Sequence, residues 1–162
     1  MSSNNQFPSH YKDFIVALNN HNVEYLLIGG YAMGAYGHIR GTNDLDIFIN
    51  ANELNAGKML NVCEEYGIPK EAIQKEMFLV QKMIGIGDPP LRIEILKSVG
   101  SFDFEYAFQR RVVRKVDNVD INVVDLDDLI ILKKSAIKDR KKARDEEDLT
   151  FLERLKSRLS KK

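Results

Sequence analysis

The stretch GGYAMGAYGHIRGTNDLDIFI, Gly29 to Ile49, joins two apolar segments of the chain. A glycine pair follows the apolar run 25–28, and two aspartates one residue apart open a second apolar run at Ile47. The start of a buried strand is a costly place for two neighbouring negative charges unless something compensates them. The chemistry of this stretch therefore sets the expectations for the rest of the chain.

The length and composition are typical of one globular domain. The chain has 162 residues, 44% hydrophobic and 30% charged, which is enough to bury a core but short for two domains. No apolar run approaches the roughly 18 residues of a membrane-spanning helix, and the N-terminus lacks the features of a secretory signal. We expect one cytoplasmic domain over 1–162 with no membrane partner, a core over 24–124 and a C-terminal helical region over 125–160.

The charges are divided unevenly along the chain. Residues 1–132 carry 12 Lys and Arg against 18 Asp and Glu, whereas residues 133–162 carry 12 against 6. A basic end of this kind can attract a polyanion such as nucleic acid, or it can lie against the acidic body. A solvated helix face is favoured by pairs of opposite charge four residues apart: Lys141/Asp145, Lys142/Glu146 and Arg144/Asp148. The single cysteine, Cys63, is expected to be a small buried hydrophobe.

Hydrophobic periodicity predicts alternating helices and strands. Helices are expected from Tyr11 to near His21 and Asn22, at 31–36, up to Tyr66 from a cap at Asn50 or Asn52, from Leu126 after a cap at Asp125, and around Leu149 to Leu159. Strands are expected at 24–28, 44–49 and 91–96, with a hairpin at 112–116 and 119–123, while 77–86 fits either a strand or a helix. This order predicts an α/β (α+β) fold in which helices pack on a mixed sheet.

The acidic pair opens a predicted strand. Asp44 and Asp46 project from the same face of that strand, whereas Leu45 and Ile47 turn into the core. Two unpaired carboxylates this close repel each other unless a cation lies between them, and hard oxygen ligands favour Mg²⁺ or Mn²⁺. In isolation, such a pair is more often a solvated strand end near lysines.

The glycines before the acidic pair favour a phosphate-binding site instead. Gly29 and Gly30 follow a strand and precede a helix, where a missing Cβ lets backbone N–H groups approach a phosphate. The glycine spacing does not fit the GxGxxG dinucleotide pattern. The two features together therefore point to metal-dependent phosphate chemistry.

Three segments carry a resemblance to a known family. Gly29-Gly30-Tyr31, twelve intervening residues and then Asp44-Leu45-Asp46 resemble the GG[ST]…hDh[DE]h signature of the polymerase-β-type nucleotidyltransferase superfamily. Residues 40–46, RGTNDLD, are similar to the RxTxDxD form of its small bacterial and archaeal members, which include antitoxin-like proteins. Residues 89–96, PPLRIEIL, look like the PPxRIDIL strand that supplies their third carboxylate. The resemblance runs from Glu24 to Asp148.

The resemblance implies a fold, a reaction and a set of site residues. It implies a mixed sheet flanked by helices, with the C-terminal helices on one side, and transfer of an NMP, most simply AMP from ATP, to an acceptor hydroxyl. Asp44 and Asp46 would hold the nucleotide-bound Mg²⁺ or Mn²⁺, and Glu94 would be the third catalytic and metal-binding acid. The nucleotide would be bound by Gly29, Gly30, Tyr31, Arg40, Thr42, Lys134 and Arg140.

The sequence departs from the family pattern at three points and leaves alternatives open. Tyr31 replaces a serine, Glu94 replaces an aspartate, and the C-terminal motif K-x-A-x-x-R-x-K-D-x-x-D is matched only with stretched spacing. The acceptor could belong to a partner toxin, an RNA 3′ end or a small molecule, and a homodimer is plausible. The alternatives are a non-catalytic antitoxin or binding module with a vestigial NTP site and, less favoured, an RNA-binding protein that uses the basic tail.

Overall fold

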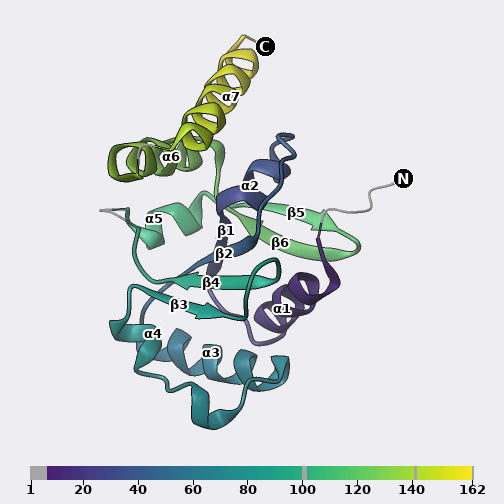
Figure 1. Ribbon diagram of the computed structural model, residues 1–162, viewed down its shortest axis with the longest axis vertical. Helices are drawn as coiled ribbons and strands as arrows, with labels where there is room; N and C mark the ends of the chain where they lie inside the picture. The colour runs from purple at the N-terminus through teal and green to yellow at the C-terminus, as the bar shows by residue number, and fades with distance from the viewer. Residues whose placement is uncertain (1–6, 100–101, 141, 162) are drawn as a thin grey trace.

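Six strands form one mixed sheet across the middle of the molecule (Figure 1). The computed structural model describes residues 7–99, 102–140 and 142–161, without the side chain of Arg140. The strands are β1 Tyr25–Ile28, β2 Asp44–Ile49, β3 Met83–Ile86, β4 Arg92–Leu96, β5 Val112–Val116 and β6 Val119–Val123. They lie in the order β3-β4-β2-β1-β6-β5, with β1 antiparallel to β2 and parallel to β6, and β2 parallel to β4.

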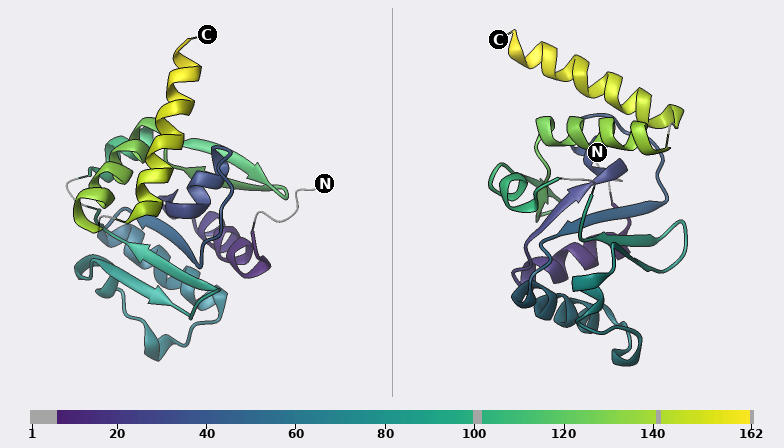
Figure 2. Two further views of the ribbon diagram at one scale, coloured as in Figure 1. Left: turned by 45° about the horizontal axis from the view of Figure 1, so that its top comes forward. Right: turned by 90° about the vertical axis from the view of Figure 1, so that its left-hand side faces the viewer.

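Helices cover both faces of this sheet. They are α1 Ser9–Asn20, α2 Gly29–Ala35, α3 Glu53–Tyr66, α4 Met77–Val80, α5 Phe104–Gln109, α6 Leu126–Arg140 and α7 Ala143–Ser160, with a 3₁₀ turn at Lys70–Ala72. Helices α1 and α3 lie on one side of the sheet, whereas α6 and α7 lie one above the other on the opposite side (Figure 2). The predicted mixed sheet with the C-terminal helices on one side is confirmed.

Local signals place most of the element boundaries. The Asn52 side chain accepts a hydrogen bond from the Asn55 amide at 2.8 Å and starts α3, and Gly67 ends that helix with a φ of 101°. Asp125 caps α6 by accepting from the Asp128 amide at 2.8 Å. The β5–β6 hairpin turns through Asp117 and Asn118, both with positive φ. All three features follow the predictions.

Three elements differ from the sequence predictions. The ambiguous segment 77–86 is both a helix and a strand, because α4 ends at Val80 and β3 begins at Met83. Helix α2 begins at Gly29, two residues earlier than expected. Helix α5, which has six residues, was not predicted. The Asp103 side chain caps it by accepting a hydrogen bond from the Glu105 amide, and the Phe104 ring meets the Phe48 ring edge-on, with centroids 5.0 Å apart. So short a helix has too few turns to show a periodic pattern and depends on packing instead.

Successive side chains of β2 point alternately into the core and to the opposite face of the sheet. Leu45 and Ile47 are fully buried, whereas Asp44 and Asp46 point to the other face and are half-buried. Cys63 is buried as expected, and this burial raises the pKa of its thiol to about 12. Among the described residues, none of the helices is both long and apolar enough to cross a membrane.

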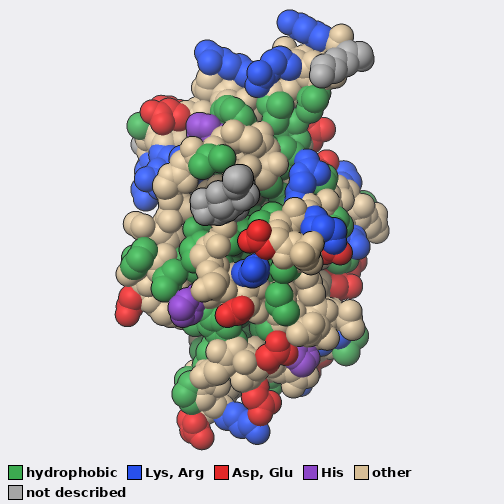
Figure 3. All heavy atoms as spheres, turned by 90° about the vertical axis from the view of Figure 1, so that its right-hand side faces the viewer, with side chains coloured by type: hydrophobic (Ala, Val, Ile, Leu, Met, Phe, Trp, Pro, Cys, Tyr) green, Lys and Arg blue, Asp and Glu red, His purple; other side chains and the backbone are tan. Residues whose placement is uncertain are grey.

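The basic C-terminal segment is partly neutralised by its own neighbours. Lys156 of α7 pairs with Asp127 of α6 at 2.7 Å, while Lys and Arg side chains gather where α7 ends (Figure 3). The predicted pairing of Arg144 with Asp148 is wrong, because Asp148 is fully buried and faces inward. The predicted partner Lys141 lies outside the described residues. The four-residue spacing of charges could not show that Asp145 and Asp148 lie on the inner, buried face of α7.

Candidate active site

Three carboxylates meet where β2 and β4 begin. Asp46 lies opposite Glu94 in the parallel β2–β4 pair, and Asp44 precedes Asp46 by two residues on the same face. One oxygen from each of the three side chains lies within 4.8 Å of the others. Parallel neighbours at one register point the same way, so the sheet itself brings these acids together.

This crowding changes the proton affinity of the central acid. Burial raises the pKa of the Asp46 carboxyl to about 7, helped by the charges of Glu94 and Asp44 and by a hydrogen bond with Glu94. Lys133 acts in the opposite direction. At neutral pH, the site therefore favours a proton or a cation among the acids.

The first turn of α2 lies directly against Asp46. Gly29 has a φ of +75°, and a Cβ at this position would clash with the Asp46 carboxylate. At Gly30, a Cβ would lie 2.8 Å from Cβ of Thr42. Ile28 caps this helix without a side-chain hydrogen bond, so the first backbone N–H groups receive no side-chain oxygen there. Glycine is needed at both positions because the backbone approaches the acids and the returning loop closely.

Tyr31 does not face the acids. Its ring stacks on Phe7 with centroids 4.9 Å apart and meets the edge of Tyr11 at 5.4 Å. It lines a neighbouring cavity of about 460 Å³ beneath the β5–β6 hairpin, together with Arg114 and Thr42. The Tyr31 side chain is therefore engaged in aromatic contacts and does not line the pocket of Asp46 and Glu94.

The Tyr11 hydroxyl joins the beginnings of the two acidic strands. Its oxygen lies 2.9 Å from the Pro90 carbonyl, 3.0 Å from the Arg92 carbonyl and 3.3 Å from the Asn43 carbonyl. These carbonyls belong to the segments that lead into Asp44 and Glu94. The buried Tyr11 side chain thus ties α1 to the strand ends that present the acids.

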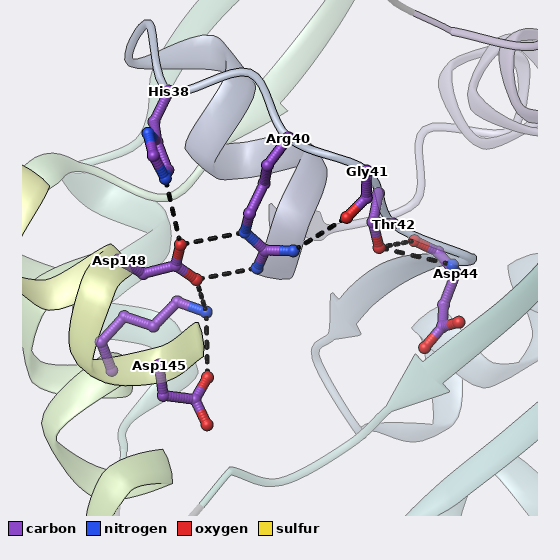
Figure 4. A network of polar contacts seen from close by, with 8 residues as sticks. His38, Arg40, Gly41, Thr42, Asp44, Asp145 and Asp148 are labelled. Carbon is purple, nitrogen blue, oxygen red and sulfur yellow. Dashed lines mark hydrogen bonds and ion pairs between the residues drawn. The ribbon is translucent and has the colours of Figure 1, made fainter. Parts of the chain in front are cut away.

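A buried ion network lies beside the acids and joins α6, α7 and the loop after α2 (Figure 4). Lys133 Nζ lies 2.8 Å from Asp148 Oδ2 and 3.5 Å from Asp145 Oδ1. Arg40 binds both oxygens of Asp148 through Nε at 2.9 Å and Nη2 at 2.8 Å. His38 Nε2 lies 3.5 Å from Asp148 Oδ1.

The network sets the charge state of its central acid. Burial alone would raise the pKa of the Asp148 carboxyl, but hydrogen bonds from Arg40 and Lys133 outweigh this and hold the pKa below its usual value. Asp148 therefore remains charged at neutral pH. Its three cationic or polar neighbours fix the C-terminal helices against the loop that leads into β2.

The structure brings only some of the predicted nucleotide-binding residues to the acids. Arg40 is engaged by Asp148, and Lys134 is exposed and pairs with Glu153 at 3.8 Å. Arg140 ends α6, and its side chain lies outside the described residues. The lysine that reaches the site is Lys133, which sequence analysis missed. The sequence could have predicted this position of Lys133. It follows Leu129 by four residues and precedes Ala136 by three, which places it on the predicted inner face of the helix.

A pocket of about 240 Å³ lies between the acids and α6. Asp46, Glu94 and Gly29 form one wall, whereas Lys133 and Asp139 come from α6. The rest of the lining consists of Ser135 and six apolar residues: Ile28, Leu96, Val99, Leu129, Leu132 and Ala136. The pocket thus combines hard oxygen donors, a buried lysine and an apolar wall.

The donor set fits a divalent cation. All three ligands offer carboxylate oxygen, which Mg²⁺ and Mn²⁺ prefer over nitrogen or sulfur. The pKa of Asp46 is raised chiefly by burial and then by the charges of Glu94 and Asp44, and Lys133 offsets this only in part. Asp44, Asp46 and Glu94 would hold the ion.

One protein family matches nearly the whole chain. A family described as "Nucleotidyl transferase of unknown function (DUF2204)" matches residues 9–162. None of the curated proteins compared with the chain matches it. Among solved structures, the chain is similar to an antigenic nucleotidyltransferase-like protein from Paracoccidioides brasiliensis, with 15% identity and a TM-score of 0.49 over 88% of this chain and 74% of that one.

Replacing Tyr11 by Phe tests the link between α1 and the acidic strands. Loss of the hydroxyl leaves buried carbonyl oxygens without this donor, so we expect a destabilisation of about 1–2 kcal/mol, measured by urea unfolding. Tyr66→Phe is the matched control, because the Tyr66 ring packs on Phe14 at 5.1 Å and its hydroxyl has no hydrogen bond within the described part of the chain. Equal losses in both variants would contradict the assignment.

Asp46→Asn tests the charge crowding. The folded-state pKa lies above the ordinary value of 3.8, so the folded protein binds this proton more tightly than the unfolded chain, and stability falls as pH rises from 3.8 to about 7. Without metal at pH 8, we expect the variant to melt about 2–8 °C higher than the wild type, a difference that shrinks toward pH 4. Mg²⁺ should stabilise the wild type alone. A variant that melts lower at pH 8 would show that the acids are not crowded.

Lys133→Met and Lys134→Met form a matched pair that tests the buried network. Removing Lys133 leaves two buried aspartates short of a cation, which costs about 3–5 kcal/mol. Removing Lys134 breaks an exposed pair that contributes about 0–1 kcal/mol. Thermal and urea unfolding should separate the two variants clearly. Equal stability of the two variants would show that the network around Asp148 is not formed in solution.

Proposed function

Because the chain belongs to the family described as "Nucleotidyl transferase of unknown function (DUF2204)", we propose that it transfers a nucleoside monophosphate from an NTP to an acceptor hydroxyl. The observation that carries this proposal is the meeting of Asp44, Asp46 and Glu94 beside the Gly29 turn. The acceptor oxygen bonds to the α-phosphorus, the bond from that phosphorus to the bridging oxygen breaks, and pyrophosphate leaves.

The three acids divide the work. Asp44 and Asp46 bind the cation that accompanies the nucleotide, while Glu94 stands on the acceptor side and orients the hydroxyl or takes its proton. Divalent ions, when bound, stabilise the attacking and leaving oxygens of the displacement. What supports a shared centre is that oxygens of all three side chains lie within 4.8 Å of one another.

The phosphates are held by backbone and by one lysine. The N–H groups of Gly29, Gly30 and Tyr31 open α2 beside Asp46, where a phosphate oxygen can accept from them. Lys133 takes the role that the sequence assigned to Lys134, because it lines the pocket and acts on Asp46. Arg40 then serves as the partner of Asp148 that holds the loop before β2 in place.

The finer parts of the proposal come from the family resemblance. We propose ATP as the donor and Mg²⁺ as the ion, since the small members that the sequence resembles are thought to favour ATP. A nucleotide donor and a buried free cysteine fit the cytoplasm. The acceptor is a hydroxyl of a partner toxin, an RNA end or a small molecule, and pairing of two copies follows the same resemblance.

Transfer of radiolabel tests the reaction. Incubation with Mg²⁺ and ATP labelled at the α-phosphate should label one of three acceptor classes: protein, RNA 3′ ends or hydroxylated small molecules. Label at the γ-phosphate should appear only in pyrophosphate. Asp44→Asn and Asp46→Asn should each lower the rate by at least about 100-fold, because each removes a ligand of the reacting centre.

An exposed aspartate provides the control. Asp13→Asn, on the solvent side of α1, should leave the rate unchanged. Wild-type protein that binds Mg²⁺ and ATP but transfers no label to any class would favour the non-catalytic binding module. Transfer of the γ-label to an acceptor would replace nucleotidyl transfer by phosphoryl transfer.

A further inference from the structure

An arginine lies beside the third acid on the same face of β4. Arg92 precedes Glu94 by two residues, and its Nε donates to Glu94 Oε2 at 2.9 Å. The side chains are 29% and 25% exposed, so water screens this pair only in part. A second donor, Nη1, reaches the Gly87 carbonyl at 3.2 Å. The guanidinium is therefore anchored between Glu94 and the loop that joins β3 to β4.

The neighbouring strand leaves room for this guanidinium. Gly85 of β3 lies opposite Glu94, and a Cβ at Gly85 would clash with the Arg92 guanidinium. The φ of Gly85 is not positive, so the backbone conformation itself does not require glycine. Space for Arg92 is what glycine provides at this position.

We propose that Arg92 is a positioning residue that presents Glu94 to the divalent cation, an inference that rests on the proposed function. A glutamate has one more rotatable bond than the aspartate usual at this position, so its carboxylate would otherwise sample several orientations. Arg92 donates a hydrogen bond to Oε2 of Glu94 and makes no hydrogen bond to Oε1, which can therefore face the cation. Arg92 also balances the charge of Glu94 before a cation arrives.

The hydrogen bonds of Arg92 distinguish this role from phosphate binding. Nε is used by Glu94, Nη1 by the Gly87 carbonyl, and Nη2 lies 4.0 Å from Met83 Sδ. A planar guanidinium with this fixed set of partners cannot turn toward a triphosphate without releasing Glu94. Lysine has a single flexible ammonium and should replace it only in part.

Metal binding without nucleotide provides the direct test. Mn²⁺ affinity is measured by electron paramagnetic resonance for wild type, Arg92→Met, Arg92→Lys and Gly85→Ala. We expect Arg92→Met and Gly85→Ala to weaken Mn²⁺ binding about tenfold and Arg92→Lys to fall between them and wild type, as for other residues that orient metal ligands. Gly85→Ala is informative because it displaces the guanidinium without removing its charge. Gly57→Ala is its control, since a Cβ at Gly57 meets nothing within 4 Å.

Steady-state kinetics separates positioning from nucleotide binding. The Mg²⁺ concentration for half-maximal rate should rise in the variants, while KM for the nucleotide at saturating Mg²⁺ changes less than about twofold. Tighter Mn²⁺ binding in Arg92→Met would show that Arg92 competes with the cation, and unchanged Mn²⁺ binding with a raised nucleotide KM would show that it binds phosphate. Either result overturns the inference alone. Wild-type protein that binds no Mn²⁺, or binds it equally well as Asp46→Asn, overturns the proposed metal site as well.

Discussion

The repulsion among three carboxylates on adjacent strands is the constraint around which this structure is organised. Parallel pairing of β2 with β4 places Asp46 beside Glu94, and period-two alternation adds Asp44 to the same face. Such a cluster is costly in a folded chain unless protons, protein cations or metal ions reduce its charge. The protein uses Lys133 from α6 on one side and Arg92 on the other. The pKa of Asp46 is nevertheless raised to about 7, first by burial and then by the charges of Glu94 and Asp44.

The same electrostatic problem explains why the C-terminal helices are part of the site. Lys133 is buried, and a buried ammonium needs partners of its own. These partners are Asp145 and Asp148 of α7. Arg40, in the loop before β2, forms a second ion pair with Asp148. A chain of opposite charges thus runs from the acids of the sheet to Lys133 of α6, to Asp145 and Asp148 of α7, and to Arg40 in the loop that leads into β2. Stability and site geometry depend on the same contacts.

Sequence analysis predicted what depends on neighbours in the chain and missed what depends on distant ones. Strand β2, the β5–β6 hairpin and the cap at Asp125 have local signals in alternation, turn chemistry and capping. The grouping of the acids followed from a motif and a strand period. Which of the two lysines, Lys133 or Lys134, faces the acids depends on how α6 is rotated about its own axis relative to the sheet. A motif with stretched spacing does not define that rotation. The Tyr11 hydroxyl meets carbonyls about 80 positions away in sequence, and no local pattern encodes such a contact.

Two departures from the family pattern favoured a vestigial site, and both have a structural explanation that leaves the acids intact. The Tyr31 ring packs against Phe7 and Tyr11, so it supports the side chain of Tyr11. The start of α2 still lies against Asp46 at Gly29. The stretched C-terminal motif still delivers a buried lysine to the pocket, because Lys133 of α6 lines the pocket and pairs with Asp148 of α7 at 2.8 Å. A chain released from catalysis would have no evident reason to retain a repulsive acid cluster together with two separate devices, Lys133 and Arg92, that make it tolerable. The cost of holding the cluster is therefore the physical argument behind the proposed transfer reaction.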